Sequence, residues 1–119
     1  MVDTNLGVVE ARFADLIWEH EPIPSRKLAE LCAEELNWKR PTTYNVLRKL
    51  CEKGIFRNQD GIVSSAVSRQ EFYGMQGEQF VEDAFEGSLP AFVAAFTARK
   101  KPSEAEIREL LDIINRGRD

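Results

Sequence analysis

The side chains of this 119-residue sequence that are best suited to bind a ligand lie between positions 39 and 57. Basic side chains can bind phosphate groups, and amide, hydroxyl and aromatic side chains can contact the edges of nucleic-acid bases. The residues of these types in the segment are Lys39, Arg40, Thr42, Tyr44, Asn45, Arg48, Lys49, Lys53 and Arg57. We therefore treat the segment as a candidate DNA-binding surface.

The distribution of charge along the chain supports that interpretation. Residues 39–67 hold six Lys or Arg against two acidic residues, whereas residues 1–38 hold three against eight and residues 68–119 hold seven against ten. The net charge of −4 thus conceals a basic patch within an acidic chain. A basic helix face is commonly no more than solvated surface. Here, however, the patch coincides with one predicted helix and the hairpin that follows it, which favours nucleic acid.

The individual side chains predict different contacts. Asn45 could pair bidentately with adenine, Thr42 could meet a base or a phosphate, and Tyr44 could pack on a sugar or a thymine methyl group. Arg48 could read guanine, although its late position in the helix favours the DNA backbone. Arg57 could reach a phosphate or the minor groove. The residues best placed for phosphates are Lys39, Arg40, Lys49 and Lys53.

Hydrophobic spacing and helix-breaking residues predict six helices and one β-hairpin. The helices cover about 7–20, 25–36, 41–52 and 69–86, and two more contain 89–96 and 107–114. Ser25, Ser88 and the serines of two capping boxes, Ser68 and Ser103, are expected to cap helices. The strands cover 55–58 and 62–66 around Asp60-Gly61, a pair suited to a tight reversal.

Three helices followed by a hairpin are typical of a winged helix-turn-helix. The expected fold class is therefore mainly α with a small β-hairpin, a winged-helix DNA-binding domain (1–67) followed by a helical dimerisation domain (68–119). About 50 residues rarely enclose a sufficient core alone, so we expect a homodimer. The alternative is that these helices fold back onto the first domain. The residues expected to dimerise are Phe72, Phe80, Phe85, Leu89, Phe92, Phe96, Ile107, Leu110, Leu111 and Ile114.

The sequence gives no support for an enzyme, and we expect no catalytic residue, metal or cofactor. His20 is the single histidine, and acidic pairs such as Glu34-Glu35 are adjacent on helices, where their carboxylates diverge. Cys32 and Cys51 match no zinc spacing. We interpret them as buried free thiols, with a redox switch or metal site as the alternative. No apolar run approaches the roughly 20 residues of a membrane span, and no secretory signal is visible, so a cytoplasmic location without membrane insertion is expected.

The ordered set of motifs resembles the BlaI/MecI penicillinase-repressor family over about residues 6–115. Residues 6–18 look like its first helix, and Trp38, Thr42, Leu47 and 50–54 match its recognition-helix region. Phe80, 85–89 and 103–110 match its dimerisation half. The resemblance implies a homodimeric transcriptional repressor that occludes a promoter by binding a palindromic operator. The alternative is a winged-helix module that binds proteins without touching DNA.

The resemblance also implies how repression could be relieved. In antibiotic-responsive members, a membrane sensor protease triggers cleavage of an Asn-Phe bond in the fourth helix. The equivalent bond here joins Gln79 to Phe80, so the first residue of the pair differs. Copper-responsive relatives carry paired cysteines near the C-terminus, and this sequence has no cysteine after Cys51.

Overall fold

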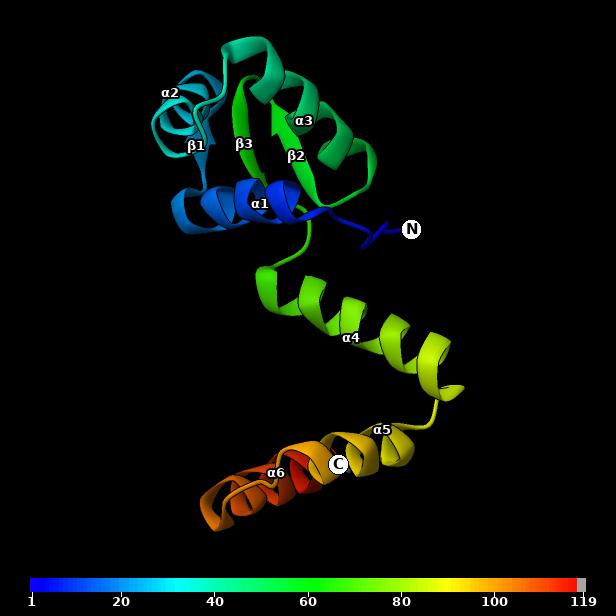
Figure 1. The fold of residues 1–119 in the computed structure, drawn as a ribbon. Coiled ribbons are helices and arrows are strands. Elements are labelled where there is room, and N and C mark those ends of the chain that lie inside the picture. Colours follow the sequence, from blue (N-terminus) through cyan, green and yellow to red (C-terminus); the bar gives the residue numbers. More distant parts are fainter. Residues whose placement is uncertain (118–119) are drawn as a thin grey trace. The chain divides into compact units, whose positions relative to one another are not determined.

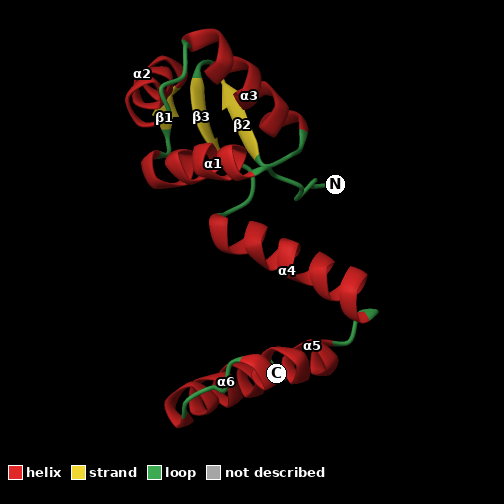
Figure 2. Cartoon of the chain, viewed as in Figure 1, coloured by secondary structure: helices red, strands yellow, loops and turns green. Residues whose placement is uncertain are grey.

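The computed structural model describes residues 1–117, which form six helices and a three-stranded sheet (Figures 1 and 2). In chain order the elements are α1 (Val8–His20), β1 (Ile23–Pro24), α2 (Ser25–Glu35), α3 (Arg40–Glu52), β2 (Phe56–Gln59), β3 (Ile62–Ser65), α4 (Arg69–Phe85), α5 (Leu89–Arg99) and α6 (Glu104–Arg116). The mainly helical winged-helix fold expected from the sequence is confirmed. Contacts divide the chain into two compact units, the first comprising Met1–Gly77 and the second beginning at Glu78, within α4.

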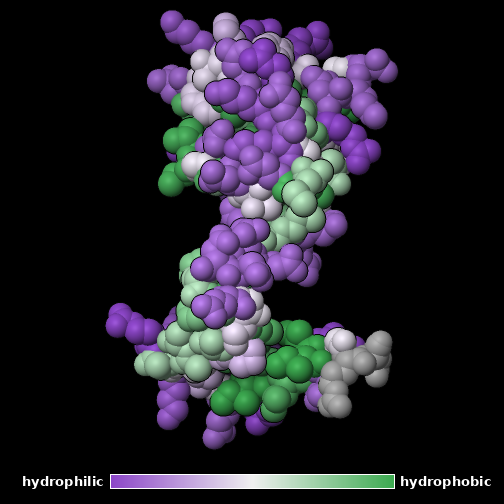
Figure 3. All heavy atoms as spheres, turned by 90° about the vertical axis from the view of Figure 1, so that its right-hand side faces the viewer, coloured by the Kyte–Doolittle hydropathy of each residue, from purple (hydrophilic) through white to green (hydrophobic). Residues whose placement is uncertain are grey.

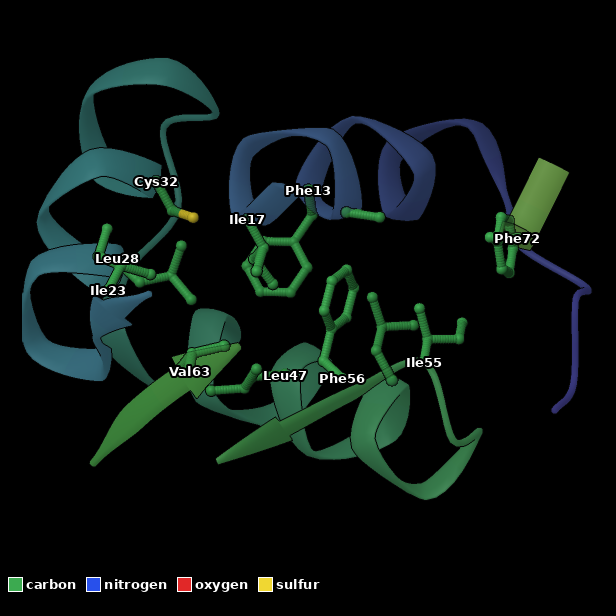
Figure 4. Packing of buried hydrophobic residues seen from close by; sticks show 12 residues of the cluster. Phe13, Ile17, Ile23, Leu28, Cys32, Leu47, Ile55, Phe56, Val63 and Phe72 are labelled. Atoms are coloured by element: carbon green, nitrogen blue, oxygen red, sulfur yellow. The ribbon is translucent and has the colours of Figure 1, made fainter. Parts of the chain in front are cut away.

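The first unit is built around one apolar core (Figure 4). Phe13 and Ile17 of α1 meet Leu28 and Cys32 of α2, because residues four apart lie on one face of a helix. The same core includes Leu47 and Leu50 of α3 and Ile55, Phe56 and Val63 around the hairpin. Its side chains are nearly all fully buried, so the three helices and the hairpin hold one another in place.

The sheet is antiparallel, in the order β1-β3-β2. Asp60 and Gly61 both take positive φ, at 53° and 80°, which makes the tight reversal expected between β2 and β3. The sequence did not indicate β1, whose Ile23 and Pro24 pair with Val63 and Ile62. A strand of two residues is too short to show an alternation of apolar and polar side chains, and it is defined only by its pairing with β3.

The start of α2 differs from the prediction that Ser25 caps it. Pro24 is the N-cap residue, and Ser25 is the first residue inside the helix. The main-chain nitrogen of Ser25 instead donates a 2.7 Å hydrogen bond to the carbonyl of Gly61 in the β2–β3 turn. A long-range contact therefore satisfies this helix end in place of a local serine hydroxyl.

The first turns of α4 belong to the first unit. Ser68 and Glu71 form the expected capping box, with hydrogen bonds of 3.1 and 3.2 Å. Phe72 is fully buried, with its ring centroid 5.5 Å from that of Trp18. We expected Phe72 in the dimerisation set; it instead completes the core of the first unit, because Trp18 covers it. Arg69 fixes the same turn through a 3.1 Å ion pair with Asp15.

The second unit comprises the end of α4 with α5 and α6. The rings of Phe80, Phe85 and Phe92 pack edge to face, with centroids 5.7 to 6.0 Å apart. Ser88 caps α5 as expected, since its hydroxyl accepts a hydrogen bond from the nitrogen of Ala91. Ser103 caps α6 in the expected capping box, and its backbone and side-chain hydrogen bonds lower the pKa of the Glu106 carboxyl.

None of the helices within residues 1–117 is long and apolar enough to cross a membrane.

Candidate nucleic-acid interface

Helix α3 has one buried face and one exposed face. Thr43, Leu47 and Leu50 are buried at helical spacing and fix α3 to the core. The opposite face of the helix points outward: Thr42, Tyr44, Asn45, Arg48 and Lys49 are all exposed. The helix begins after Lys39, and Pro41 lies in its first turn, where proline is tolerated. Gly54, at a φ of +83°, turns the chain away after the helix ends.

Three of the side chains predicted to bind DNA meet in one place. Tyr44, Asn45 and Arg48 line a shallow cavity of about 410 Å³ between α3 and the hairpin, together with Leu47 and Cys51. Asn58 of β2 completes the lining, and the sequence prediction missed it. The signal was available, because alternation along a strand places Asn58 on the same side as the buried Phe56.

Arg48 forms an ion pair with Glu52, one turn further along α3. Its Nε lies 3.9 Å from a carboxylate oxygen of Glu52, and the two side chains are 67% and 70% exposed. Such a pair stabilises a helix by only ~0.3–0.5 kcal/mol, because water and salt screen it. Arg48 can therefore leave Glu52 for a phosphate or a base at small cost.

The remaining basic residues fall into two groups. Lys39, Arg40, Lys49 and Arg57 are exposed, and within residues 1–117 none of them has an acidic partner within 4.0 Å. Lys53 differs, since it is half-buried and its ammonium group donates a hydrogen bond to the carbonyl of Asn5. The sequence predicted that Lys53 binds a DNA phosphate, whereas in the structure its ammonium group already has a hydrogen-bond partner within the protein.

The two cysteines and the single histidine lie on three different helices, with His20 in α1, Cys32 in α2 and Cys51 in α3. Cys32 is buried, which raises the pKa of its thiol to about 11. Cys51 is half-buried, and burial followed by the charge of Glu52 raises the pKa of its thiol. His20 bonds the carbonyl of Leu16 through Nδ1 at 2.9 Å. No group of three potential metal ligands occurs within the part of the chain that the structure describes.

Apolar side chains expected to dimerise are exposed on the second unit. Figure 3 shows hydrophobic residues gathered on its surface. The exposed members are Phe80, Leu89, Phe96, Ile107, Leu110, Leu111 and Ile114, each 43–58% exposed, whereas Phe85 and Phe92 are half-buried. Val93 and Ile113 belong to the same surface although the sequence prediction omitted them. Phe96, Leu110 and Ile113 also line a cavity of about 410 Å³ between α5 and α6.

The bond between Gln79 and Phe80 lies in α4, in the second unit. Both side chains are exposed, and the Gln79 amide nitrogen donates a 2.8 Å hydrogen bond to Asp83. The bond is in regular helix, so a protease could cleave it only after local unwinding.

Comparisons with known proteins agree on one relationship. Residues 6–116 match the penicillinase repressor family. The methicillin resistance regulatory protein MecI of Staphylococcus aureus (strain Mu50 / ATCC 700699) is 23% identical over 115 residues, which cover 93% of this chain and 94% of that protein.

Proposed function

Because this chain belongs to the penicillinase repressor family, whose members repress transcription, we propose that it acts as a homodimer on a palindromic DNA operator. Bound there, it would occlude a promoter, which requires no chemical reaction. The observation that carries the proposal is the exposed face of α3, where Tyr44, Asn45 and Arg48 converge beside the hairpin in an otherwise acidic chain.

The dimensions of α3 suit the major groove of DNA, which admits one helix. With Thr43, Leu47 and Leu50 against the core, the opposite face of α3 is presented to the groove. Asn45 and Thr42 would contact bases, and Arg48 would contact a base or the backbone. Lys39, Arg40, Lys49 and Arg57 would bind phosphates, which set affinity and register.

The dimer is supported by the apolar surface of the second unit. Phe96, Leu110 and Ile114 are each about half exposed, and neighbouring residues of α5 and α6 continue the patch. Contiguous apolar surface of this kind commonly marks an interface. A two-fold interface would cover it on both copies and present two recognition helices to the two halves of an operator.

The proposal includes relief of repression by cleavage between Gln79 and Phe80. The bond lies just beyond Gly77, where the first unit ends. Cleavage would leave the winged-helix unit without α5 and α6, and hence without the proposed dimer interface. Mass spectrometry of the protein recovered from induced cells tests this step. A protein that remains full-length while repression is lost would exclude cleavage as the cause.

A DNA-binding titration tests the central proposal. Fluorescence anisotropy would follow labelled DNA from upstream of the protein's own gene, with scrambled DNA of equal length as the control. We expect a dissociation constant well below ~1 μM for the upstream DNA at moderate salt. Four to six phosphate contacts per subunit would make log affinity fall with log salt concentration by about 0.9 per contact. Equal, weak binding to both sequences would exclude a repressor acting at this site.

One alternative keeps the fold but changes the partner. The exposed apolar surface of α5 and α6 could bind a different protein, with the winged-helix unit serving as a frame. In that case, changes to the exposed face of α3 would leave partner binding intact.

A further inference from the structure

The first six residues form an extended segment, which we call the N-terminal strap (Met1–Leu6), along one side of the first unit. Its burial alternates: Val2, Thr4 and Leu6 are half-buried, whereas Asp3 and Asn5 are exposed. Val2 and Leu6 pack against the apolar core. This alternation is that of an edge strand, although no β-ladder pairs with it among residues 1–117.

One side of the strap is tied to the end of the recognition helix. The nitrogen of Asp3 donates a 2.9 Å hydrogen bond to the carbonyl of Lys53, directly after α3. The Lys53 ammonium donates to the carbonyl of Asn5 in return. A Cβ added to Gly54 would lie 3.6 Å from the carbonyl oxygen of Met1 and 3.7 Å from Cα of Val2, so the strap passes close over this turn.

The other side of the strap is tied to α4. The Gln76 amide nitrogen donates a 2.9 Å hydrogen bond to the carbonyl of Thr4. In extended chain, successive carbonyls point to opposite sides, so the carbonyls of Thr4 and Asn5 serve different partners. The strap therefore bridges the C-terminal end of α3 and the part of α4 within the first unit.

We propose that Lys53 and Gln76 are positioning residues for operator binding, which act through the strap and touch no DNA. The inference depends on the proposed function. The buried residues of α3 fix where the helix lies, and the strap fixes its last turn, beside Arg48 and Lys49. Small changes in the direction of a recognition helix alter several base and phosphate contacts at once, so a loosened strap would lower affinity.

The test uses the full chain and a matched pair of glutamines on α4. Gln76→Leu removes the donor to Thr4, and Gln70→Leu makes the same chemical change at an exposed position whose side chain forms no hydrogen bond within residues 1–117. We expect operator affinity to fall by about three- to tenfold in Q76L, the effect of one hydrogen bond, and to stay unchanged in Q70L. Gln76→Glu also removes the donor, keeps the side-chain size and serves if Q76L folds poorly.

Lys53→Met separates positioning from phosphate binding. Loss of a phosphate contact would reduce the slope of log affinity against log salt by about 0.9, whereas loss of a strap contact would lower affinity with the slope unchanged. Lys53→Arg keeps a donor and should restore affinity. A slope reduced by about 0.9 in K53M, or equal affinities of Q76L and Q70L, would overturn the proposal.

Amide hydrogen exchange in the DNA-free protein supplies a readout that does not depend on the proposed function. In K53M and Q76L, the amides of Asp3 and of residues 53–55 should exchange faster, while those in α2 stay unchanged. If the wild-type protein binds no operator but these amides exchange faster in the variants, the proposed repressor function is wrong. The structural link between the strap and the end of α3 is then still supported. Unchanged exchange in both variants would show that the strap does not hold the end of α3.

Discussion

The indole nitrogen of Trp18 donates a 3.1 Å hydrogen bond to the main-chain carbonyl of Val67. This bond joins α1 to the connection between the hairpin and α4, across 49 residues of sequence. The Trp18 ring also lies with its centroid 5.2 Å from that of Phe56 and 5.5 Å from that of Phe72. One side chain thus fastens the hairpin and the start of α4 to the same helix.

Trp18→Phe keeps an aromatic ring but leaves the Val67 carbonyl without its donor. We expect the free energy of unfolding to fall by about 1–3 kcal/mol, the cost of a partly buried polar group left unpaired. Urea unfolding followed by far-ultraviolet circular dichroism measures the change. Trp38→Phe is the matched control: Trp38 packs on Phe13, and no hydrogen bond of its indole occurs within residues 1–117. Equal losses in the two variants would contradict the role of the Trp18 bond.

The buried thiol of Cys32 should make the free energy of unfolding decrease as pH rises in the alkaline range. Its thiol ionises near pH 9.0 when unperturbed, and burial raises its pKa to about 11 in the folded protein. Because the unfolded chain releases this proton first, the stability contributed by the neutral thiol is complete below about pH 9 and is lost as pH rises towards 11.

The measurement compares the wild type with Cys32→Ala in urea unfolding at several pH values between 8 and 11. The wild type should lose up to ~1.4 kcal/mol per pH unit more than the variant over this range. Cys51 and the other titrating groups are common to both proteins, so their effects cancel. Parallel pH profiles would show that the Cys32 thiol is not shielded from ionisation.

The elements that carry the site could be predicted because their signals are local. Thr43, Leu47 and Leu50 repeat at helical spacing, which fixes the exposed face of α3, and Asp60-Gly61 marks the turn of the hairpin. The clustering of Tyr44, Asn45 and Arg48 follows from that face.

The features that the sequence did not reveal depend on contacts distant in the chain. Burial of Phe72 requires Trp18 beside it, and β1 requires β3. The hydrogen bond of the Lys53 ammonium group requires the carbonyl of Asn5, 48 residues away in the sequence. The charge pattern alone predicted that Lys53 binds a phosphate. No feature of the neighbouring sequence distinguishes a lysine that binds DNA from one that donates a hydrogen bond to the N-terminal strap.

The double change of Asn45→Ala and Arg48→Ala tests the exposed face of α3. Both side chains are exposed and line the same cavity, so their removal should leave the fold and the oligomeric state intact. Each good contact to a base contributes about 1–3 kcal/mol, so operator affinity should fall by at least 30-fold. Anisotropy measures affinity, and sedimentation measures the oligomer. Unchanged affinity would favour the protein-interaction alternative.

Leu110→Glu tests the link between dimerisation and DNA binding. Leu110 lies in the apolar surface of α6, and a carboxylate there would lose its hydration inside an interface, at a cost of several kcal/mol. We expect sedimentation to show the 13.6 kDa monomer in place of a dimer of twice that mass. Operator affinity should fall by about 100-fold or more, because the second half-site is no longer bound by a tethered subunit.

Arg108→Gln changes the net charge by the same amount at an exposed position outside the predicted dimerisation set, and should alter neither property. A monomeric L110E that keeps wild-type operator affinity would contradict a repressor that needs both recognition helices.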